Sequence, residues 1–317
     1  MSHSTMAVRL TALTAALTLV VAGCGDDGGG EASSDELSGK TFTVGSKEFT
    51  EQKILGAIAI RVLEDAGATV KDETGIEGTP NVRAALEAGE IDMYWEYTGT
   101  GFIELLGNSP ADAPKDPQEL FDAVAEQDSA NGIKWINKSE ANDTYAFATS
   151  QATSDELGVT SISDFAELAN SDPESATLCA AAEFLDREDG FPGVEEEYGF
   201  DLPDAQITEV ELDIIYTALP DADPCAFGEV FESAGQIPAN DLVVLEDDKQ
   251  FFPGYEVAMT IKEEVLADSP EVEEVLAPVA EALTTEELQQ LNAQVDVEGL
   301  PVEAVAEKWL EENGLIG

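Results

Sequence analysis

Two stretches of the sequence decide the fold: residues 41–52 read TFTVGSKEFTEQ, and residues 89–102 read GEIDMYWEYTGTGF. The first stretch predicts a strand followed by a helix, which begins near Thr50 and ends at Gly67, because apolar residues recur along it at helical spacing. A second, shorter helix is expected from Thr79 to Gly89. The second stretch then predicts a strand that ends at a Thr-Gly-Thr-Gly break. Strand, helix and strand in this order indicate an α/β class with a parallel sheet.

Working outward from these stretches, the chain of 317 residues suits two domains better than one. Further short strands are expected near residues 145–149, 178–182, 242–245 and 255–261, and the C-terminal part is expected to be helical. We therefore expect two α/β lobes. Lobe one would take residues 40–145 plus 238–317, lobe two would take residues 146–237, and the cleft between them would be a natural ligand site.

The charge of the chain excludes whole classes of function. The sequence has 14 Lys and Arg against 67 Asp and Glu, a formal net charge of −53. Nucleic-acid binding needs a basic patch, and docking on anionic lipid needs one as well, so neither is expected. Molar salt shortens the Debye length to about 3 Å and screens such self-repulsion. We interpret the acidity as adaptation to high salt, with an acidic protein from an ordinary environment as the alternative.

The single histidine, His3, excludes further chemistry. It lies in a segment that we expect to be removed, so Ser-His-Asp hydrolysis, Cys-His catalysis and His-ligated zinc are not expected. Two acidic clusters, at Asp221-x-Asp223 and at Glu246 to Asp248, resemble calcium ligands. With 67 acidic residues such clusters arise by chance, so we expect no metal and no cofactor.

The N-terminus is typical of an exported lipoprotein. Arg9 precedes an apolar run from Leu10 to Ala22, which is too short to span a bilayer, and Gly23-Cys24 follows. The end of this run resembles a bacterial lipobox. Residues 1–23 would be the signal peptide, Cys24 the lipidated residue and residues 24–39 a flexible tether. The protein would then lie on the outer face of the cell membrane and touch the membrane through its lipid anchor only. An ordinary signal peptide with a chance cysteine is the alternative.

The two remaining cysteines, Cys179 and Cys225, would meet an oxidising environment in an exported protein. We therefore expect them to pair, although sequence does not show whether their Cα atoms lie close enough.

Three sequence features are candidates for a ligand site. Lys47 stands where a strand ends and a helix begins, the edge of an open α/β sheet at which ligands bind. Trp95 and Tyr97 share one face of the next strand, beside hydroxyls and glycines. Tyr97, Tyr145 and Tyr255 each lie at an expected strand end or beside a turn. Aromatic faces attract quaternary ammonium groups.

These features belong to an ordered set of segments that resembles the glycine betaine/choline/carnitine-binding proteins of bacterial ABC importers. The segments are GSKEFTEQKILG at 45–56, GEIDMYWEYTGTGF at 89–102, NDTYAFA at 142–148, EFLDREDGFPG at 183–193, FGEVF at 227–231 and DLVVLEDDKQFFPGY at 241–255. The resemblance implies a two-lobed periplasmic-binding-protein fold of type II and a monomeric solute receptor rather than an enzyme. It also implies an ABC permease as partner.

The resemblance further implies a site in which an aromatic box holds a quaternary ammonium group, most simply that of glycine betaine. Phe231 stands where the family usually has Tyr, and Tyr216 is an alternative for that position. Lys47 and Arg187 would hold the ligand carboxylate, so choline is expected to bind at least about a hundredfold more weakly. An osmotic sensor or an extracytoplasmic enzyme on the same fold is the competing function. The implied ligand-binding residues are Lys47, Tyr97, Thr100, Tyr145, Arg187, Phe231 and Tyr255.

Overall fold

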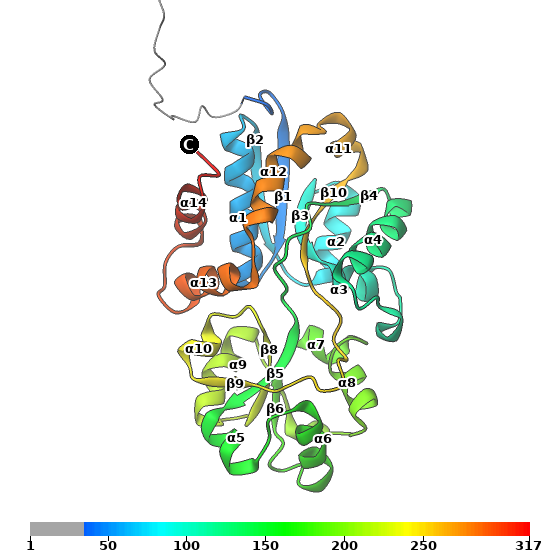
Figure 1. The fold of residues 1–317 in the computed structure, drawn as a ribbon, viewed down its shortest axis with the longest axis vertical. Helices are drawn as coiled ribbons and strands as arrows, with labels where there is room; N and C mark the ends of the chain where they lie inside the picture. Colours follow the sequence, from blue (N-terminus) through cyan, green and yellow to red (C-terminus); the bar gives the residue numbers. More distant parts are fainter. Residues whose placement is uncertain (1–34) are drawn as a thin grey trace, which may run out of the picture. The chain divides into compact units, whose positions relative to one another are not determined.

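The computed structural model describes residues 35–317, which contain two five-stranded sheets (Figure 1). In the first sheet, β1 runs parallel to β2 and β3, whereas β10 runs antiparallel between β3 and β4. We call this sheet and the helices that cover it lobe one. Its strands, in spatial order, are β2 (Thr69–Ile76), β1 (Thr41–Lys47), β3 (Met93–Tyr97), β10 (Val257–Lys262) and β4 (Ile133–Ile136).

Lobe one combines helices from both ends of the described chain. Helix α1 packs against β1, β2 and the C-terminal helix α14, and its apolar stripe is buried as its spacing predicts. Pro80 lies in the first turn of α2, and Gly89 ends that helix at φ 72°, a left-handed conformation that glycine adopts easily. The helices are α1 (Thr50–Asp65), α2 (Thr79–Ala88), α3 (Thr98–Thr100), α4 (Pro117–Asp128), α11 (Glu263–Asp268), α12 (Glu271–Ala282), α13 (Thr285–Asp296) and α14 (Val302–Glu312).

Lobe two is built on the second sheet. Strand β6 runs parallel to β7 and β8, and β5 runs antiparallel to β8 and β9. Its strands, in spatial order, are β7 (Ile207–Glu209), β6 (Leu178–Ala180), β8 (Phe227–Phe231), β5 (Tyr145–Ser150) and β9 (Leu242–Val244). Its helices are α5 (Gln151–Leu157), α6 (Ile162–Ser171), α7 (Ala182–Asp186), α8 (Phe191–Tyr198), α9 (Leu212–Ala218) and α10 (Gln236–Ala239).

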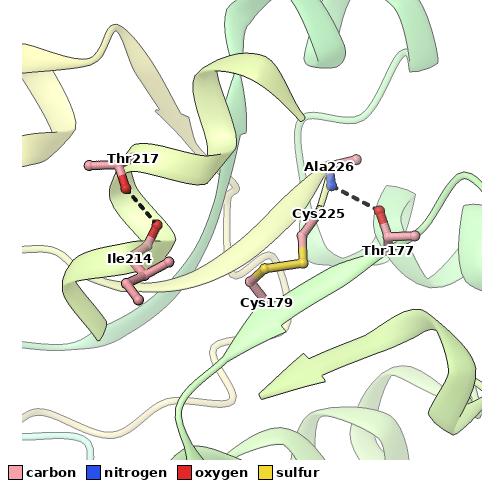
Figure 2. The surroundings of a disulfide bond; sticks show 6 residues. All are labelled: Thr177, Cys179, Ile214, Thr217, Cys225 and Ala226. Atoms are coloured by element: carbon pink, nitrogen blue, oxygen red, sulfur yellow. Dashed lines mark hydrogen bonds between the residues drawn. A yellow bond between two sulfur atoms is a disulfide. The ribbon is translucent and has the colours of Figure 1, made fainter. Parts of the chain in front are cut away.

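A disulfide joins Cys179 on β6 to Cys225, which lies just before β8 (Figure 2). The two Cα atoms are 5.5 Å apart, and both cysteines are fully buried. Beside them, the backbone N–H of Ala226 donates to Oγ1 of Thr177 at 2.9 Å. The disulfide thus links two neighbouring parallel strands within lobe two, as the sequence predicts.

The structure differs from the expected domain boundaries in two places. Strand β9 pairs with β5 in lobe two, although the prediction returns the chain to lobe one at residue 238. Leu37 is fully buried and its N–H donates to the carbonyl of Ala66 at 2.9 Å, so the packed domain begins inside the stretch predicted as tether. The predicted signal peptide, His3 and Cys24 lie outside the described residues. Within residues 35–317, no helix is both long and apolar enough to cross a membrane.

Candidate ligand-binding site

Residues of both lobes line a cavity of about 460 Å³. Six of the seven residues predicted for the site contribute to its wall, and Arg187 lies behind the wall. The six are Lys47, Tyr97, Thr100, Tyr145, Phe231 and Tyr255. Tyr97 and Thr100 come from the β3–α3 junction of lobe one, and Tyr145 and Phe231 come from paired strands of lobe two. The cavity therefore has a wall on each lobe.

Five aromatic rings gather in this wall. Phe231 lies at the centre, with its ring centroid 4.9 Å from that of Tyr145 and 5.6 Å from that of Phe49. Tyr145 meets Tyr255 edge to face at 5.4 Å, and Tyr97 stacks on Phe49 at 6.4 Å. We call these five residues the aromatic pocket. Several ring faces and edges around one space suit a quaternary ammonium group, whose charge interacts with the ring quadrupoles.

Phe49 is a site residue that the sequence reasoning missed. It stands at the N-cap of α1, two residues after Lys47 and within the segment GSKEFTEQKILG at 45–56. Phe49 could have been predicted as a site residue, because it is a large apolar residue between charged residues at the expected edge of the sheet. Tyr216, the alternative for the fourth box position, does not line the cavity. Its hydroxyl accepts a hydrogen bond from the backbone N–H of Phe231 at 3.0 Å, so it positions the strand that carries Phe231.

Buried carboxylates orient two of the pocket tyrosines. The hydroxyl of Tyr97 donates to Oε1 of Glu51 at 2.8 Å, and the hydroxyl of Tyr255 donates to Oδ2 of Asp189 at 2.6 Å. Burial raises the pKa of both tyrosines well above the ordinary value, and the neighbouring carboxylates raise it further. Both hydroxyls therefore stay protonated and keep the rings fixed.

Lys47 is 4% exposed and already has an anionic partner. Its Nζ lies 2.7 Å from Oε1 of Glu96 and 5.1 Å from the centroid of the Tyr97 ring. Glu96 is fully buried and also accepts hydrogen bonds from the Tyr94 hydroxyl and from the Tyr97 backbone N–H. Lys47 is thus part of a buried ion pair that faces the cavity.

Arg187 is likewise ion-paired, and it supports the pocket from behind. It binds Asp189 with two hydrogen bonds, 2.8 Å from Nε and 2.5 Å from Nη2, and its Nη1 donates to Glu183 at 2.9 Å. Its Cζ lies 5.4 Å from the centroid of the Tyr145 ring. The resemblance implied that Arg187 holds a ligand carboxylate. In the structure its strongest partners are carboxylates of the protein itself.

The cavity wall is strongly acidic. Among the described residues that line it, Lys47 is the one base, against seven carboxyl groups: Glu48, Glu77, Asp143, Glu183, Glu209, Glu211 and Glu229. Burial raises the pKa of Glu229 to about 8. Burial acts in the same direction on Glu183, but the charges of Lys47 and Arg187 outweigh it and hold its pKa at about 2. Such a wall favours a positively charged group in the cavity.

Contacts around the cavity also join the lobes. Glu183 of α7 accepts hydrogen bonds from the hydroxyl and the backbone N–H of Thr79, at the start of α2, at 2.7 and 3.1 Å. Across residues 35–317, no group of three or more His, Cys, Asp or Glu side chains is arranged to hold a metal ion. Side chains of both lobes thus meet around an acidic, aromatic pocket.

Comparisons with known proteins agree with this geometry. Residues 40–312 match the family described as the substrate-binding domain of the ABC-type glycine betaine transport system. The chain is 34% identical to a glycine-betaine-binding protein of Pseudomonas aeruginosa over 87% of this chain and 89% of the relative. It is 33% identical to the glycine betaine-binding protein YehZ of Escherichia coli, over 86% and 90% of the two chains.

The solved structure of ligand-free YehZ from Escherichia coli superimposes with a TM-score of 0.63 at 32% identity. The match covers 87% of this chain and 99% of that one. The chain thus belongs to the family of substrate-binding domains of ABC-type glycine betaine transport systems, and it is an extracytoplasmic solute-binding protein rather than an enzyme.

Proposed function

We propose that this protein captures a small quaternary ammonium compound in the aromatic pocket and delivers it to an ABC permease. The observation that carries the proposal is the group of five rings around an acidic cavity of about 460 Å³. A desolvated cation–π contact contributes about 2 kcal/mol, so three or four of them supply the roughly 8 kcal/mol of a micromolar ligand. A quaternary nitrogen has no N–H, so the rings leave no donor unsatisfied.

Glycine betaine is the first candidate ligand, since two similar proteins are named as its binders. Lys47 has three N–H donors and uses one on Glu96, so it retains donors for a ligand carboxylate.

Choline is the second candidate, and the ion pairs of the site favour it. Since Lys47 is paired with Glu96 and Arg187 with Asp189, choline would leave no buried cation without a partner. We therefore expect the affinity for choline to lie less than about a hundredfold below that for glycine betaine, in contrast to the expectation from the sequence.

Calorimetric titration at molar salt tests the ligand class. Glycine betaine and choline are compared with 3,3-dimethyl-1-butanol, the neutral carbon analogue of choline. We expect both quaternary ammonium compounds to bind and the analogue to bind at least about a hundredfold more weakly, because it loses the cation–π contacts. Equal binding of choline and its neutral analogue would contradict the proposal.

Two buried tyrosines give a matched pair of variants. Tyr145→Leu removes a ring of the aromatic pocket and should abolish measurable binding of both quaternary ammonium compounds. Tyr198→Leu removes a ring that packs in lobe two away from the cavity and already carries Lys249 on its face, at 4.7 Å. That variant should bind normally once folded, so equal losses in the two variants would show that the effect is one of stability.

We also propose that Cys24 carries a lipid that anchors the protein to the outer face of the membrane, on the strength of the lipobox-like sequence before it. Cys24→Ser should move the protein from the membrane fraction to the soluble fraction.

Deleting the gene should abolish uptake of labelled ligand. Uptake that persists while a response to the ligand is lost would favour the sensor function instead.

A further inference from the structure

A buried polar cluster beside the aromatic pocket connects the two lobes. Glu51 lies on α1 and Asn292 on α13, both in lobe one, whereas Ser233 follows β8 in lobe two. Asp143 lies in the segment that leads into β5. The four residues are between 1% and 4% exposed. We call them the bridging cluster, because their side chains meet across the boundary between lobes.

The Ser233 hydroxyl makes two contacts with carboxyl oxygens in the bridging cluster, and these contacts need one more hydrogen than the hydroxyl can supply. The Ser233 hydroxyl lies 2.5 Å from Oε2 of Glu51 and also within hydrogen-bond distance of Oδ1 of Asp143. A serine hydroxyl has a single hydrogen, so it can donate to only one of these oxygens. The other contact would then bring two oxygen atoms together with no hydrogen between them, which is repulsive. It becomes a hydrogen bond only if one of the two carboxyl groups is protonated. The geometry thus contains one shared proton.

Glu51 is the carboxylate best served by other donors. The Tyr97 hydroxyl donates to its Oε1 at 2.8 Å, and Nδ2 of Asn292 donates to its Oε2 at 2.9 Å. The other N–H of Asn292 donates to the backbone carbonyl of Ser233 at 3.1 Å. The proton therefore belongs on Asp143, which donates it to Ser233, and Ser233 donates in turn to Glu51.

The electrostatic surroundings agree with this assignment. Burial, and then the charge of Glu51, raise the pKa of Asp143 well above its ordinary value. Burial also raises the pKa of Glu51, while hydrogen bonds from Ser233, Asn292 and Tyr97 oppose that rise.

Within residues 35–317, no basic side chain bonds to the bridging cluster. Among the described residues that line the small cavity beside it, none is basic. Lys47, which lies over the Tyr97 ring, is paired with Glu96. The titratable groups facing the cluster are Tyr97 of β3, Asp213 and Tyr216 of α9, and Asp296 of α13. Burial raises the pKa of Asp296, and the charge of Lys53 on α1 partly opposes that rise.

We propose that the proton held between Asp143, Ser233 and Glu51 is a latch between the lobes, so that the protein holds its ligand more tightly when this proton is bound. The inference goes beyond the proposed function and rests on it only for the ligand used as a probe. Asp143 also lines the ligand cavity, and the latch acts by stabilising contact between the lobes.

The sign of the pH effect follows from the geometry. When the lobes separate, Ser233 leaves Glu51, and both carboxyl groups gain water that favours their ionised forms. The closed form therefore binds more protons than the open form, and rising pH shifts the population toward the open form. Between the two pKa values, one linked proton weakens ligand binding by up to about tenfold per pH unit.

The test compares ligand affinity across pH in matched variants at molar salt. In wild type, the affinity for glycine betaine should fall as pH rises and the shared proton is lost. Asp143→Asn supplies an N–H to Ser233 at every pH, so its affinity should stay level and exceed that of wild type at least about tenfold at the upper end of the pH series. Asp213→Asn removes a neighbouring exposed carboxylate that does not touch Ser233, and it should keep the wild-type slope.

Burial raises the pKa of Glu229 to about 8, and its ionisation strengthens binding of the quaternary ammonium group as pH rises, so the series is repeated in the Glu229→Gln background. A flat affinity in that background, or equal slopes for Asp143→Asn and Asp213→Asn, would overturn the latch and leave the proposed function intact.

Urea unfolding without ligand tests the latch independently of which ligand the protein binds. The unfolding midpoint of Asp143→Asn, relative to wild type, should rise as pH rises, because only wild type must give up the shared proton. A constant difference between the two proteins would overturn the latch whether or not glycine betaine binds.

Discussion

The ion pair of Arg187 and Asp189 gives the most direct prediction about how the pocket is built. Arg187→Met removes the guanidinium and keeps much of the stem. It leaves Asp189, which is fully buried, with the Tyr255 hydroxyl as its remaining side-chain partner. Removing one partner of a buried pair costs about 3–5 kcal/mol, because the other charge stays buried without compensation. We expect the free energy of unfolding to fall by that amount.

The double variant separates loss of charge compensation from loss of packing. Arg187→Met combined with Asp189→Asn removes both charges of the pair, and uncharged replacements of buried pairs are often close to neutral. Its free energy of unfolding should therefore recover most of what the single variant loses. Urea unfolding at molar salt measures both values, and a double-mutant cycle gives the interaction between the two side chains.

Ligand affinity in the same variants decides what Arg187 does for binding. Arg187 lies against the Tyr145 ring, and Asp189 holds the Tyr255 hydroxyl, so Arg187→Met should disturb the aromatic pocket itself. Glycine betaine and choline should then lose affinity by the same factor. A loss more than about tenfold greater for glycine betaine would show that Arg187 contacts the ligand carboxylate, and our reasoning would be wrong.

Three further predictions follow from other features. Replacing Cys179 and Cys225 with Ala opens a loop with a sequence separation of 46 and should lower the free energy of unfolding by up to about 4 kcal/mol, measured by urea unfolding; a loss below about 1 kcal/mol would refute the loop-entropy reasoning. The net charge of −53 should make the melting temperature rise between dilute buffer and molar NaCl, and a melting temperature independent of salt would count against adaptation to high salt. Because burial raises the pKa of Glu229 to about 8, this carboxyl group is mostly protonated at neutral pH, so cation binding should release a proton there. Calorimetry in buffers of different ionisation enthalpy measures the net proton exchange on binding, which also contains the uptake expected at the bridging cluster. Glu229→Gln should shift this exchange toward uptake, and an exchange unchanged in that variant would assign the released proton elsewhere.

Periodicity predicted the parts of the fold that bury one clear face. The segments β1, α1, α2 and β3 all lie close to their expected positions, because strand alternation, a helical apolar stripe, Pro80 and Gly89 are local signals. Strand β2, Thr69–Ile76, was missed because it reads TVKDETGI and leaves most of its side chains at least partly exposed. At the edge of a sheet, backbone pairing with β1 makes the strand without an apolar pattern.

The sequence could predict site residues whose position on a strand is enough to place them at the cavity. Tyr97, Tyr145 and Tyr255 line the cavity, and their contact with ligand stays a prediction. The role of Arg187 was not predictable in the same way, because it depends on where the Asp189 carboxylate points, two residues further along the chain. Sequence spacing does not report that geometry. The prediction that residues 242–244 belong to lobe one failed for a related reason, since a strand of three residues has no signal for its partner.

The position of β10 between β3 and β4 has a consequence for how the molecule is assembled. When the chain is synthesised from its N-terminus, all five strands of lobe two are present once residue 244 has been added. Lobe one must wait for β10, since β4 pairs with β10 alone, and α1 must wait still longer for α14 to cover it. The earliest segments made are therefore the last to be completed. During that interval the edge of β3 stands open to pairing with other chains, so chaperone protection is needed most at the beginning of the sequence.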